Sequence, residues 1–244
     1  MSKSKIRIFA GPNGSGKSSL FPEVNSKYNC GCFINSDAVE KLLHENGTID
    51  LTSFNLTATE EAFNQFLTQK TAISLLKKAK KRGVETHLAF RDNCICVDSG
   101  RANSYDAALI TSFIREELTL QRATYSYETV FSHTEKLEEL RRAKELGYRI
   151  YLYFIAIDDV SINEKRIEER VAKGGHHVPS DKVIRRYDAS LNNLLPALYI
   201  ADRAFLFDNS DRNYSLVAEL DNGRLTVSSD TPPNWFIKYV VNKL

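Results

Sequence analysis

The stretch that decides the fold is Ile6–Ser19, with the sequence IRIFAGPNGSGKSS. Its apolar start, Ile6–Ala10, predicts a short buried strand, and the glycine-rich turn that follows ends in Lys17 and Ser18. The spacing matches the Walker A pattern G-x-x-x-x-G-K-[ST], in which a strand, a loop and a helix hold phosphate groups. The stretch therefore predicts a phosphate-binding loop (P-loop), and the preceding strand makes a chance match less favoured.

Each residue type in this loop has a physical role. Glycines allow backbone angles at which successive N–H groups point toward phosphate oxygens at the start of a helix. Lys17 is expected to face solvent in the empty site and to reach the β- and γ-phosphates of ATP, while the Ser18 hydroxyl is expected to bind Mg²⁺. The predicted nucleotide-binding residues are Gly11, Pro12, Asn13, Gly14, Ser15, Gly16, Lys17, Ser18 and Ser19.

Length and composition favour an ordinary globular protein. The 244 residues are 42% hydrophobic and 26% charged, which allows one α/β domain spanning residues 1–244. A formal net charge of +2 gives no field that favours nucleic acid or an anionic membrane. The longest apolar run, Tyr151–Ile157, is too short to cross a bilayer, and the start MSKSKIRIF has no cleavable apolar segment. We therefore expect a cytoplasmic protein with no nucleic-acid or membrane partner.

The cysteines form two close pairs, Cys30 with Cys32 and Cys94 with Cys96. A zinc site of four thiolates is one interpretation. The usual zinc spacing is C-x₂-C, however, and cytosolic cysteines are more often buried small side chains. The second interpretation is therefore favoured, and disulfides are not expected in a reducing compartment.

Apolar runs alternate with helical patterns along the chain, which predicts a mostly parallel sheet with helices on both faces. The predicted fold is an α/β three-layer sandwich with a five-stranded core sheet, an inserted helix and β-hairpin at about 47–100, and a C-terminal hairpin at about 212–244. The core strands are expected at Ile6–Ala10, Cys32–Asn35, Thr124–Val130, Arg149–Ile157 and Ala204–Phe207.

Helix boundaries are predicted from capping and breaking residues. Pro22 indicates a short or re-angled first helix, and apolar spacing predicts one inserted helix over Ala58–Arg82. Ser104 is expected to cap the helix that follows the inserted hairpin, and Ser132–Glu135 to open another helix as a capping box. The segment Trp235–Val241 is expected to pack on the sheet edge.

Two groups of carboxylates follow predicted strands. Asp37 could act as the base that takes a proton from a substrate hydroxyl, or it could cap the next helix, and the sequence leaves both open. Asp158 and Asp159 could bind Mg²⁺, but a helix cap is favoured for them.

A charged segment at about 163–187 has the composition of a lid. Arg166 and Arg170 precede the stretch Gly174–Pro179, and Arg185 and Arg186 follow it. Arginines beside a glycine hinge are expected of a lid that closes over phosphates, although a charged helix is usually just a solvated face. A metal site at the two histidines of this stretch is not favoured, because no third ligand is evident.

Several motifs together resemble the zeta toxin family of small-molecule kinases, including its chromosomal branch of predicted ATPases. The resemblance is carried, in chain order, by AGPNGSGKSS, INSDAVEK, YSYETVFSH, AKELGYRIYLYF, RVAKGGHHVPSDKVIRRYDASL and DNS. It covers both ends of the core and leaves out roughly Gly47–Gly100 and the C-terminal tail. It implies a nucleoside-kinase-like P-loop fold that uses ATP and Mg²⁺.

The resemblance also implies roles for individual residues. Asp37 becomes the general base, and Glu128 and Thr129 become part of the acceptor pocket. Arg170 and Arg186 become the lid arginines, with Arg166 and Arg185 as neighbouring candidates. The implied reaction is phosphorylation of the sugar 3′-hydroxyl of UDP-N-acetylglucosamine, and the implied partner is a small helical antitoxin. Unlike the plasmid-borne toxins, this chain has no arginine directly after its base, so contacts to the acceptor are expected to differ.

Other nucleotide-binding classes lack their signatures here. No LSGGQ-like motif of transporter ATPases occurs, nor do the D-x-x-G and N-K-x-D motifs of GTPases. The remaining alternative is an ATP-binding regulatory or interaction protein that transfers no phosphate to a metabolite.

Overall fold

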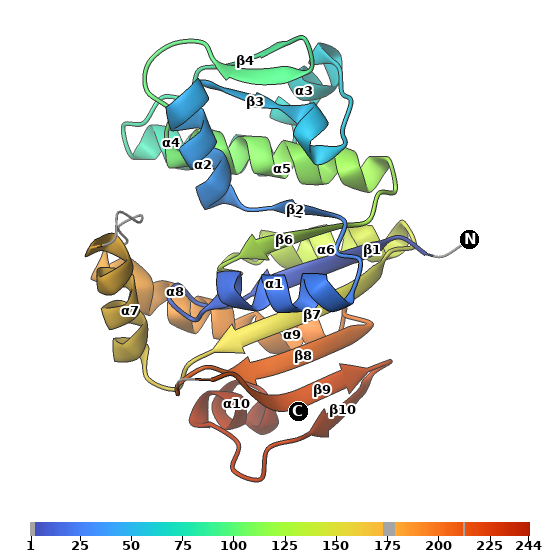
Figure 1. The fold of residues 1–244 in the computed structure, drawn as a ribbon, viewed down its shortest axis with the longest axis vertical. Coiled ribbons are helices and arrows are strands. Elements are labelled where there is room, and N and C mark those ends of the chain that lie inside the picture. Colours follow the sequence, from blue (N-terminus) through green and yellow to red (C-terminus); the bar gives the residue numbers. More distant parts are fainter. Residues whose placement is uncertain (1–2, 173–178, 212) are drawn as a thin grey trace. The chain divides into compact units, whose positions relative to one another are not determined.

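The computed structural model describes residues 3–172, 179–211 and 213–244 (Figure 1). The chain divides into two compact units. The P-loop unit comprises Met1–Cys30 and Ser126–Leu244, and the helical unit comprises Gly31–Tyr125. The organisation into one domain stays a prediction.

The P-loop unit alternates strands and helices in the order expected of an α/β protein. Its strands are β1 (Lys5–Ala10), β6 (Tyr125–Thr129, which begins at the boundary), β7 (Arg149–Ala156), β8 (Arg203–Asp208), β9 (Ser215–Asp221) and β10 (Arg224–Val227). Its helices are α1 (Lys17–Lys27), α6 (Glu135–Glu145), α7 (Val160–Ala172), α8 (Ser180–Asn192), α9 (Leu194–Leu198), α10 (Asn234–Tyr239) and the 3₁₀ helix η2 (Val241–Lys243).

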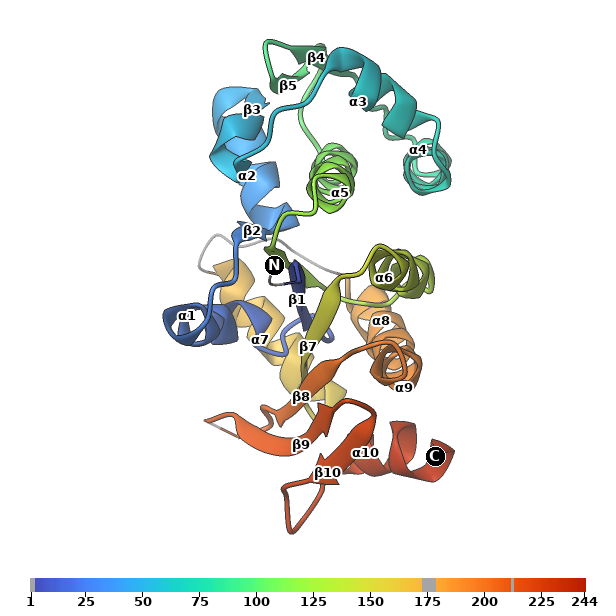
Figure 2. The ribbon, with the colours of Figure 1, turned by 90° about the vertical axis from the view of Figure 1, so that its right-hand side faces the viewer.

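The strands of this unit lie in the order β10-β9-β8-β7-β1-β6. Strands β1, β7 and β8 are parallel, and β9 and β10 extend the sheet as an antiparallel hairpin. Figure 2 shows α1 on one face of the sheet and α6, α8 and α9 on the other. The predicted fold class, a mostly parallel sheet between layers of helices, is confirmed. Because parallel strands end at the same edge, the loop after β1 shares that edge with the ends of β7 and β8.

The two faces of the sheet are packed by different side chains. On one face, even-numbered residues such as Ile8, Leu152 and Leu206 are fully buried. On the other face, Tyr153 stacks between Phe9 and Phe205 with ring centroids 5.0 and 5.2 Å apart, as the strand register requires. Aromatic pairs that lie directly opposite each other across strands stabilise both the pairing and its register.

Two helices in this unit depart from the simplest prediction. Helix α1 is not cut short: it runs to Lys27 and continues past Pro22, its sixth residue, without the one backbone hydrogen bond that a proline cannot donate. The alternative that Pro22 re-angles the helix stays a prediction. Helix α6 begins at Glu135 without the capping box, because its N-cap residue Thr134 has a helical backbone and makes no side-chain cap bond. A capping side chain needs an extended backbone at that position.

The C-terminal helix packs in a different place from the one predicted. The Trp235 ring of α10 lies 6.4 Å from the ring of Phe154 on β7, and its Nε1 donates to Asp208 of β8 over 2.8 Å. Both strands are internal to the sheet. Helix α10 is therefore anchored to central strands and not to the sheet edge.

The helical unit is built around one long buried helix. Its elements are β2 (Cys32–Ile34), α2 (Ser36–Asn46), β3 (Thr48–Asp50), the 3₁₀ helix η1 (Leu51–Phe54), α3 (Glu60–Leu67), α4 (Lys70–Lys81), β4 (Leu88–Arg91), β5 (Cys94–Val97) and α5 (Ser104–Leu120). Helix α5 packs against α2 and α4, and the Phe113 ring lies 5.2 Å from that of Phe63 and 5.5 Å from that of Phe66. The predicted hairpin is confirmed as β4 and β5, to which β3 adds a third strand.

Two helix boundaries in this unit differ from the prediction. The predicted helix Ala58–Arg82 is two helices, because the Thr68 hydroxyl donates to Gln65 O over 2.7 Å and Gln69 has an extended backbone. A hydroxyl that satisfies a terminal carbonyl can end a helix without glycine or proline. Helix α5 is capped by Asn103 and not by Ser104, with Asp106 completing a capping box.

Candidate functional site

The P-loop joins β1 to α1 in a backbone conformation that glycine makes possible. Gly11 and Gly14 have φ angles of 143° and 76°. A Cβ on Gly11 would lie 2.0 Å from Ile155 O, and a Cβ on Gly14 would lie 2.6 Å from Asn163 O. Other residues would be strained at these angles and would collide with neighbouring backbone. Tertiary packing, and not only the loop itself, therefore requires these glycines.

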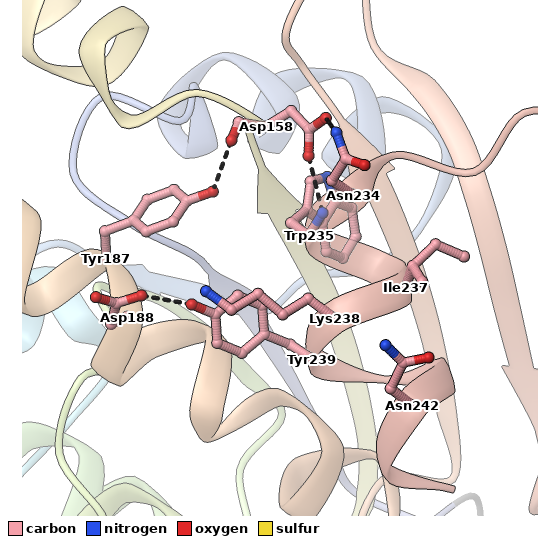
Figure 3. Close-up of a pocket in the computed structure, with 9 residues that line it drawn as sticks. All are labelled: Asp158, Tyr187, Asp188, Asn234, Trp235, Ile237, Lys238, Tyr239 and Asn242. Atoms are coloured by element: carbon pink, nitrogen blue, oxygen red, sulfur yellow. Dashed lines mark hydrogen bonds between the residues drawn. The ribbon is translucent and has the colours of Figure 1, made fainter.

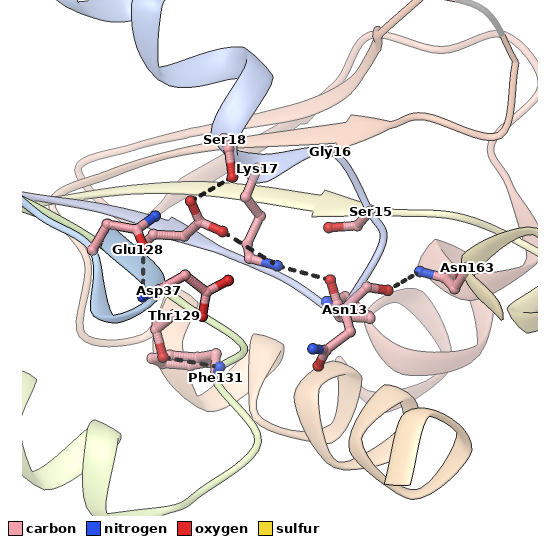
Figure 4. A network of polar contacts seen from close by, with 12 residues as sticks. Asn13, Ser15, Gly16, Lys17, Ser18, Asp37, Glu128, Thr129, Phe131 and Asn163 are labelled. Atoms are coloured by element: carbon pink, nitrogen blue, oxygen red, sulfur yellow. Dashed lines mark hydrogen bonds and ion pairs between the residues drawn. The ribbon is translucent and has the colours of Figure 1, made fainter. Parts of the chain in front are cut away.

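Lys17 is the first residue of α1, and only 6% of it is exposed. Its Nζ donates to Pro12 O over 2.8 Å and lies 3.9 Å from Glu128 Oε1 (Figure 4). The prediction that Lys17 faces solvent in the empty site is therefore wrong. The Pro12 carbonyl and the Glu128 carboxylate hold the Lys17 ammonium group over the loop.

The carboxyl end of β6 supplies polar groups to the same place. Ser18 Oγ donates to Glu128 Oε2 over 2.8 Å, so a P-loop hydroxyl and a carboxylate are adjacent (Figure 4). Thr129, the next residue, accepts a hydrogen bond from Phe131 N over 3.1 Å. The structure thus brings Glu128 to the P-loop, while its assignment with Thr129 to an acceptor pocket stays a prediction.

Three side chains that the sequence analysis did not assign to the site hold the P-loop from outside. Asn163 Nδ2 donates to Asn13 O over 2.6 Å, Asn209 Nδ2 to Ser15 O over 2.8 Å, and the Tyr214 hydroxyl to Gly16 O over 2.5 Å. Burial raises the pKa of Tyr214, which keeps its hydroxyl protonated as a donor. The one available signal was the DNS motif that contains Asn209, because polar residues directly after a buried strand mark the functional edge of such sheets.

The loop has the properties of an anion site. Ser15 Oγ and Asn13 Oδ1 are buried and have no hydrogen-bond partner among the described residues. The glycines keep Cβ atoms out of the cradle, and the helix start places N–H groups and a positive dipole end there. The oxygens of Ser18 and Glu128 are ligands of the type that Mg²⁺ prefers. The residues present therefore fit a nucleotide phosphate chain with its metal ion.

Asp37 lies in the helical unit, in the first turn of α2, and is exposed. The helix is capped by Asn35, whose side chain accepts from Asp37 N over 2.9 Å and from Ala38 N over 3.1 Å. The alternative that Asp37 itself is the N-cap is therefore wrong. Its proposed role as a base stays a prediction.

Asp159 caps the helix that follows it, as favoured from the sequence, whereas Asp158 caps a different helix, which the sequence did not predict. Asp159 accepts from Ser161 N over 2.8 Å at the start of α7. Asp158 accepts from Trp235 N over 2.8 Å and from Asn234 Nδ2 over 2.7 Å, which caps α10 from the end of β7. Both carboxylate oxygens of Asp158 are thereby used.

A surface pocket of about 400 Å³ lies beside this cap, between α8 and α10 (Figure 3). Several of its polar groups bond one another: the Tyr187 hydroxyl donates to Asp158 O over 3.3 Å, and the Tyr239 hydroxyl donates to Asp188. The pocket is thus lined by the contacts that attach α10 to the sheet.

The predicted lid arginines lie on α7 and α8. Arg166 Nη2 donates to Asp211 O over 3.3 Å, Arg185 is exposed, and Arg186 is half-buried on α8. The Arg170 side chain and the predicted glycine hinge, with its histidines, lie outside the described residues. The lid therefore stays a prediction.

In the part of the chain that the structure describes, no group of three or more His, Cys, Asp or Glu side chains is placed to hold a metal ion. Burial raises the pKa of Cys32 to about 11, which keeps its thiol protonated. Among the same residues, no helix has both the length and the apolar content of a membrane span.

Comparison with known proteins identifies the fold. No family model matches the chain. An uncharacterized protein from Haemophilus influenzae is 36% identical over 67 residues, which are 28% of this chain and 48% of that protein. The chain thus spans about half the length of the curated relative that it matches.

Solved structures match over more of the chain. The complex of AvrRxo1-ORF1 with AvrRxo1-ORF2 matches with a TM-score of 0.57, and the same complex with ATP matches with 0.58. Both matches have 13% identity and cover 93% of this chain and 61% of the other. The chromosomal toxin–antitoxin system PezAT of Streptococcus pneumoniae matches with a TM-score of 0.45 and 13% identity, over 89% of this chain and 72% of the other. The matches to AvrRxo1-ORF1 show that the chain shares the fold of that protein, in agreement with the P-loop α/β fold that its motifs predict.

Proposed function

We propose that this protein is an ATP- and Mg²⁺-dependent kinase that transfers the γ-phosphate to a hydroxyl of a nucleotide sugar such as UDP-N-acetylglucosamine. The observation that carries the proposal is the cluster at the P-loop, where Ser18 Oγ lies 2.8 Å from Glu128 Oε2 and Lys17 Nζ lies 3.9 Å from Glu128 Oε1. A hydroxyl, a carboxylate and an ammonium group at a formed phosphate cradle are the parts that phosphoryl transfer needs.

In this proposal the P-loop amides and Lys17 hold the phosphate chain of ATP, and Ser18 with Glu128 forms the metal-binding side of the site. Bound Mg²⁺ would supply charge neutralisation between the β- and γ-phosphates. Lys17 leaves Pro12 O and turns to the phosphates, a short movement because the ammonium group already lies over the loop. Charge stabilisation by such preplaced groups is the largest catalytic effect available to a kinase.

The acceptor side of the proposal rests on the helical unit. Asp37 takes the proton of the acceptor hydroxyl, a role supported by the finding that Asn35 and not Asp37 caps α2. Glu128 and Thr129 contact the acceptor, and Arg170 and Arg186 close over the transferring phosphate. These roles are carried over from the zeta toxin resemblance.

The structural neighbours add two further elements to the proposal. The AvrRxo1-ORF1 complex was solved with ATP, which we carry over as the phosphate donor. AvrRxo1-ORF1 was also solved bound to AvrRxo1-ORF2, which supports a protein partner for this chain. The small helical antitoxin proposed as that partner is carried over from the zeta toxin resemblance.

The decisive experiment incubates the protein with ATP, Mg²⁺ and UDP-N-acetylglucosamine and searches by mass spectrometry for a product heavier by one phosphate. Asp37→Asn should lower kcat by roughly 10²- to 10⁴-fold, the usual contribution of a general base, and should change ATP affinity less than twofold. Glu61→Gln is the matched control, because Glu61 is an exposed first-turn carboxylate of α3 in the same unit. This control should keep full activity.

The alternative function, a regulatory ATP-binding protein, makes the opposite prediction. ADP release would then be the same with and without nucleotide sugars, and the same in the wild type and in Asp37→Asn. If UDP-N-acetylglucosamine is inert but another hydroxyl compound accelerates ADP release, the kinase activity holds and only the acceptor changes.

A further inference from the structure

We infer that Asn163, Asn209 and Tyr214 are positioning residues that fix the P-loop peptide groups in their phosphate-binding orientation before ATP arrives. The inference deepens the proposed function and rests on it. None of the three residues belongs to the Walker A motif, and they lie between 150 and 198 residues away from their partners in the chain.

The three donors reach three carbonyls within four consecutive residues of the loop, those of residues 13, 15 and 16. Asn163, from the first turns of α7, is fully buried and bonds Asn13 O. Asn209, at the end of β8, is 8% exposed and bonds Ser15 O. Tyr214, just before β9, bonds Gly16 O. Separate elements thus hold successive parts of one short loop.

Planar trans peptides convert these bonds into a constraint on the amides. In such a peptide the N–H points opposite to the C=O of the preceding residue. Drawing the carbonyls of residues 13, 15 and 16 outward therefore turns the N–H groups of Gly14, Gly16 and Lys17 inward. A concave row of amides of this kind is an anion-binding nest.

Asn209 is itself rigidly placed, which it must be to orient another group. Its N–H donates to Ala156 O over 2.9 Å at the end of β7. The preceding Asp208 accepts from Ser210 N and from Ser210 Oγ, both over 3.0 Å, which closes a tight turn around it. The carboxamide therefore meets the loop from a turn that is fixed without the loop.

Fixed amides matter because a flexible loop would have to be ordered when the phosphate binds. Orientation that exists beforehand removes that cost from binding. The expected signature of the positioning residues is therefore weaker binding of any polyphosphate, with or without a nucleoside.

The test replaces the Asn209 donor with an acceptor of the same shape. Asn209→Asp should repel Ser15 O, turn the Gly16 N–H away and weaken binding of both ATP and inorganic tripolyphosphate by at least tenfold in calorimetric titration. Tyr214→Phe removes one oxygen atom and adds no charge, so it separates loss of a loop hydrogen bond from the repulsion that the new carboxylate of Asn209→Asp exerts on a polyphosphate. It should weaken binding of both ligands by about threefold to tenfold. The thermal unfolding midpoint without ligand is recorded for each variant.

The matched control is Asn193→Asp. Asn193 is 7% exposed, and its Nδ2 donates to a backbone carbonyl, Phe131 O, over a distance of 2.9 Å. This hydrogen bond does not involve the P-loop. The control should lose thermal stability as Asn209→Asp does while keeping the wild-type affinity for tripolyphosphate.

The outcomes separate this inference from the proposed function. Wild-type protein that binds neither ATP nor tripolyphosphate overturns both. If the wild type binds both ligands and Asn209→Asp binds them within twofold of the wild-type affinity, the inference alone is overturned. It is also overturned if Asn193→Asp weakens binding of tripolyphosphate as much as Asn209→Asp does. If Asn209→Asp does not fold, Tyr214→Phe decides: unchanged affinity overturns the inference and weakened affinity supports it.

Discussion

Lys17 is the residue whose chemistry the P-loop motif defines most clearly. We expect Lys17→Met to lower ATP turnover at least about 100-fold, because the variant has no cation for the phosphates. Its stability should fall by only about 1 kcal/mol, the usual value of one lost hydrogen bond, here to Pro12 O. Turnover is measured as ADP release and stability by urea unfolding.

Lys27→Met is the control for this prediction. Lys27 lies on the same helix, is exposed and pairs with Glu23, so its loss should leave turnover unchanged. Retained turnover in Lys17→Met would contradict the role given to the motif, and an unfolded variant would mean that Lys17 is mainly structural.

Tyr153 gives a residue-scale prediction about pH. Burial raises the pKa of Tyr153 from 10.0 to about 12. The contribution of Tyr153 to the unfolding free energy is fully present below pH 10, where its hydroxyl is protonated in both the folded and the unfolded chain. This contribution is lost toward pH 12, because the hydroxyl of the unfolded chain loses its proton first. The unfolding free energy should fall there by about 1.4 kcal/mol per pH unit from this group.

Tyr153→Phe keeps the aromatic stack with Phe9 and Phe205 and removes the ionising hydroxyl. Urea unfolding of both proteins between pH 9 and about pH 11 should show a shallower alkaline fall in the variant. Equal slopes would show that burial of this hydroxyl does not control alkaline stability.

At the scale of elements, the start of α2 contains a capping residue, Asn35, and a proposed catalytic residue, Asp37. Asn35→Ala removes the acceptor of two first-turn N–H groups and should lower the unfolding free energy by about 1 kcal/mol. Asn35→Asp keeps an acceptor and should restore most of this loss. Chemical denaturation measures both variants.

The neighbouring substitution should behave differently. Asp37→Asn is expected to change activity and to lower the unfolding free energy by less than Asn35→Ala does, since Asp37 is an exposed first-turn carboxylate that does not cap the helix. A large stability loss in Asp37→Asn, or none in Asn35→Ala, would contradict this division of roles.

At the scale of the whole molecule, the parallel strands determine where the candidate functional residues lie. The P-loop follows β1, Asp158 follows β7 and Asn209 follows β8, because parallel strands bring their carboxyl ends to the same edge. Nucleotide that binds at this edge should stabilise the folded chain by about 2.7 kcal/mol at 100 times its Kd.

Hydrogen exchange can locate that stabilisation. ATP alone should slow amide exchange in the P-loop, at the end of β6 and around Asn209, and leave the buried helix α5 of the helical unit unchanged. Addition of the acceptor should then protect the start of α2 around Asp37. Protection of α5 by ATP to the same degree as the P-loop would contradict the assignment of nucleotide binding to the P-loop unit.

The sequence by itself determined the P-loop, the core strands and the α/β class. These features depend on local chemistry: glycine angles in Ile6–Ser19, and continuous apolar runs such as the one that forms β7. Local propensity was less reliable where a side chain ended a helix. No glycine or proline marks the break between helices at Thr68. Helix α5 is capped by Asn103, although Ser104 was expected to be its N-cap.

Only the tertiary structure decided which side chains meet. Asp158 caps a helix that begins 76 residues later, and Asn209 reaches a loop 194 residues earlier. The ion pair of Lys17 likewise depends on Glu128, which the fold brings to it from β6. Strand order and register fix such partners, and no periodicity within a short stretch encodes the distance between two strand ends.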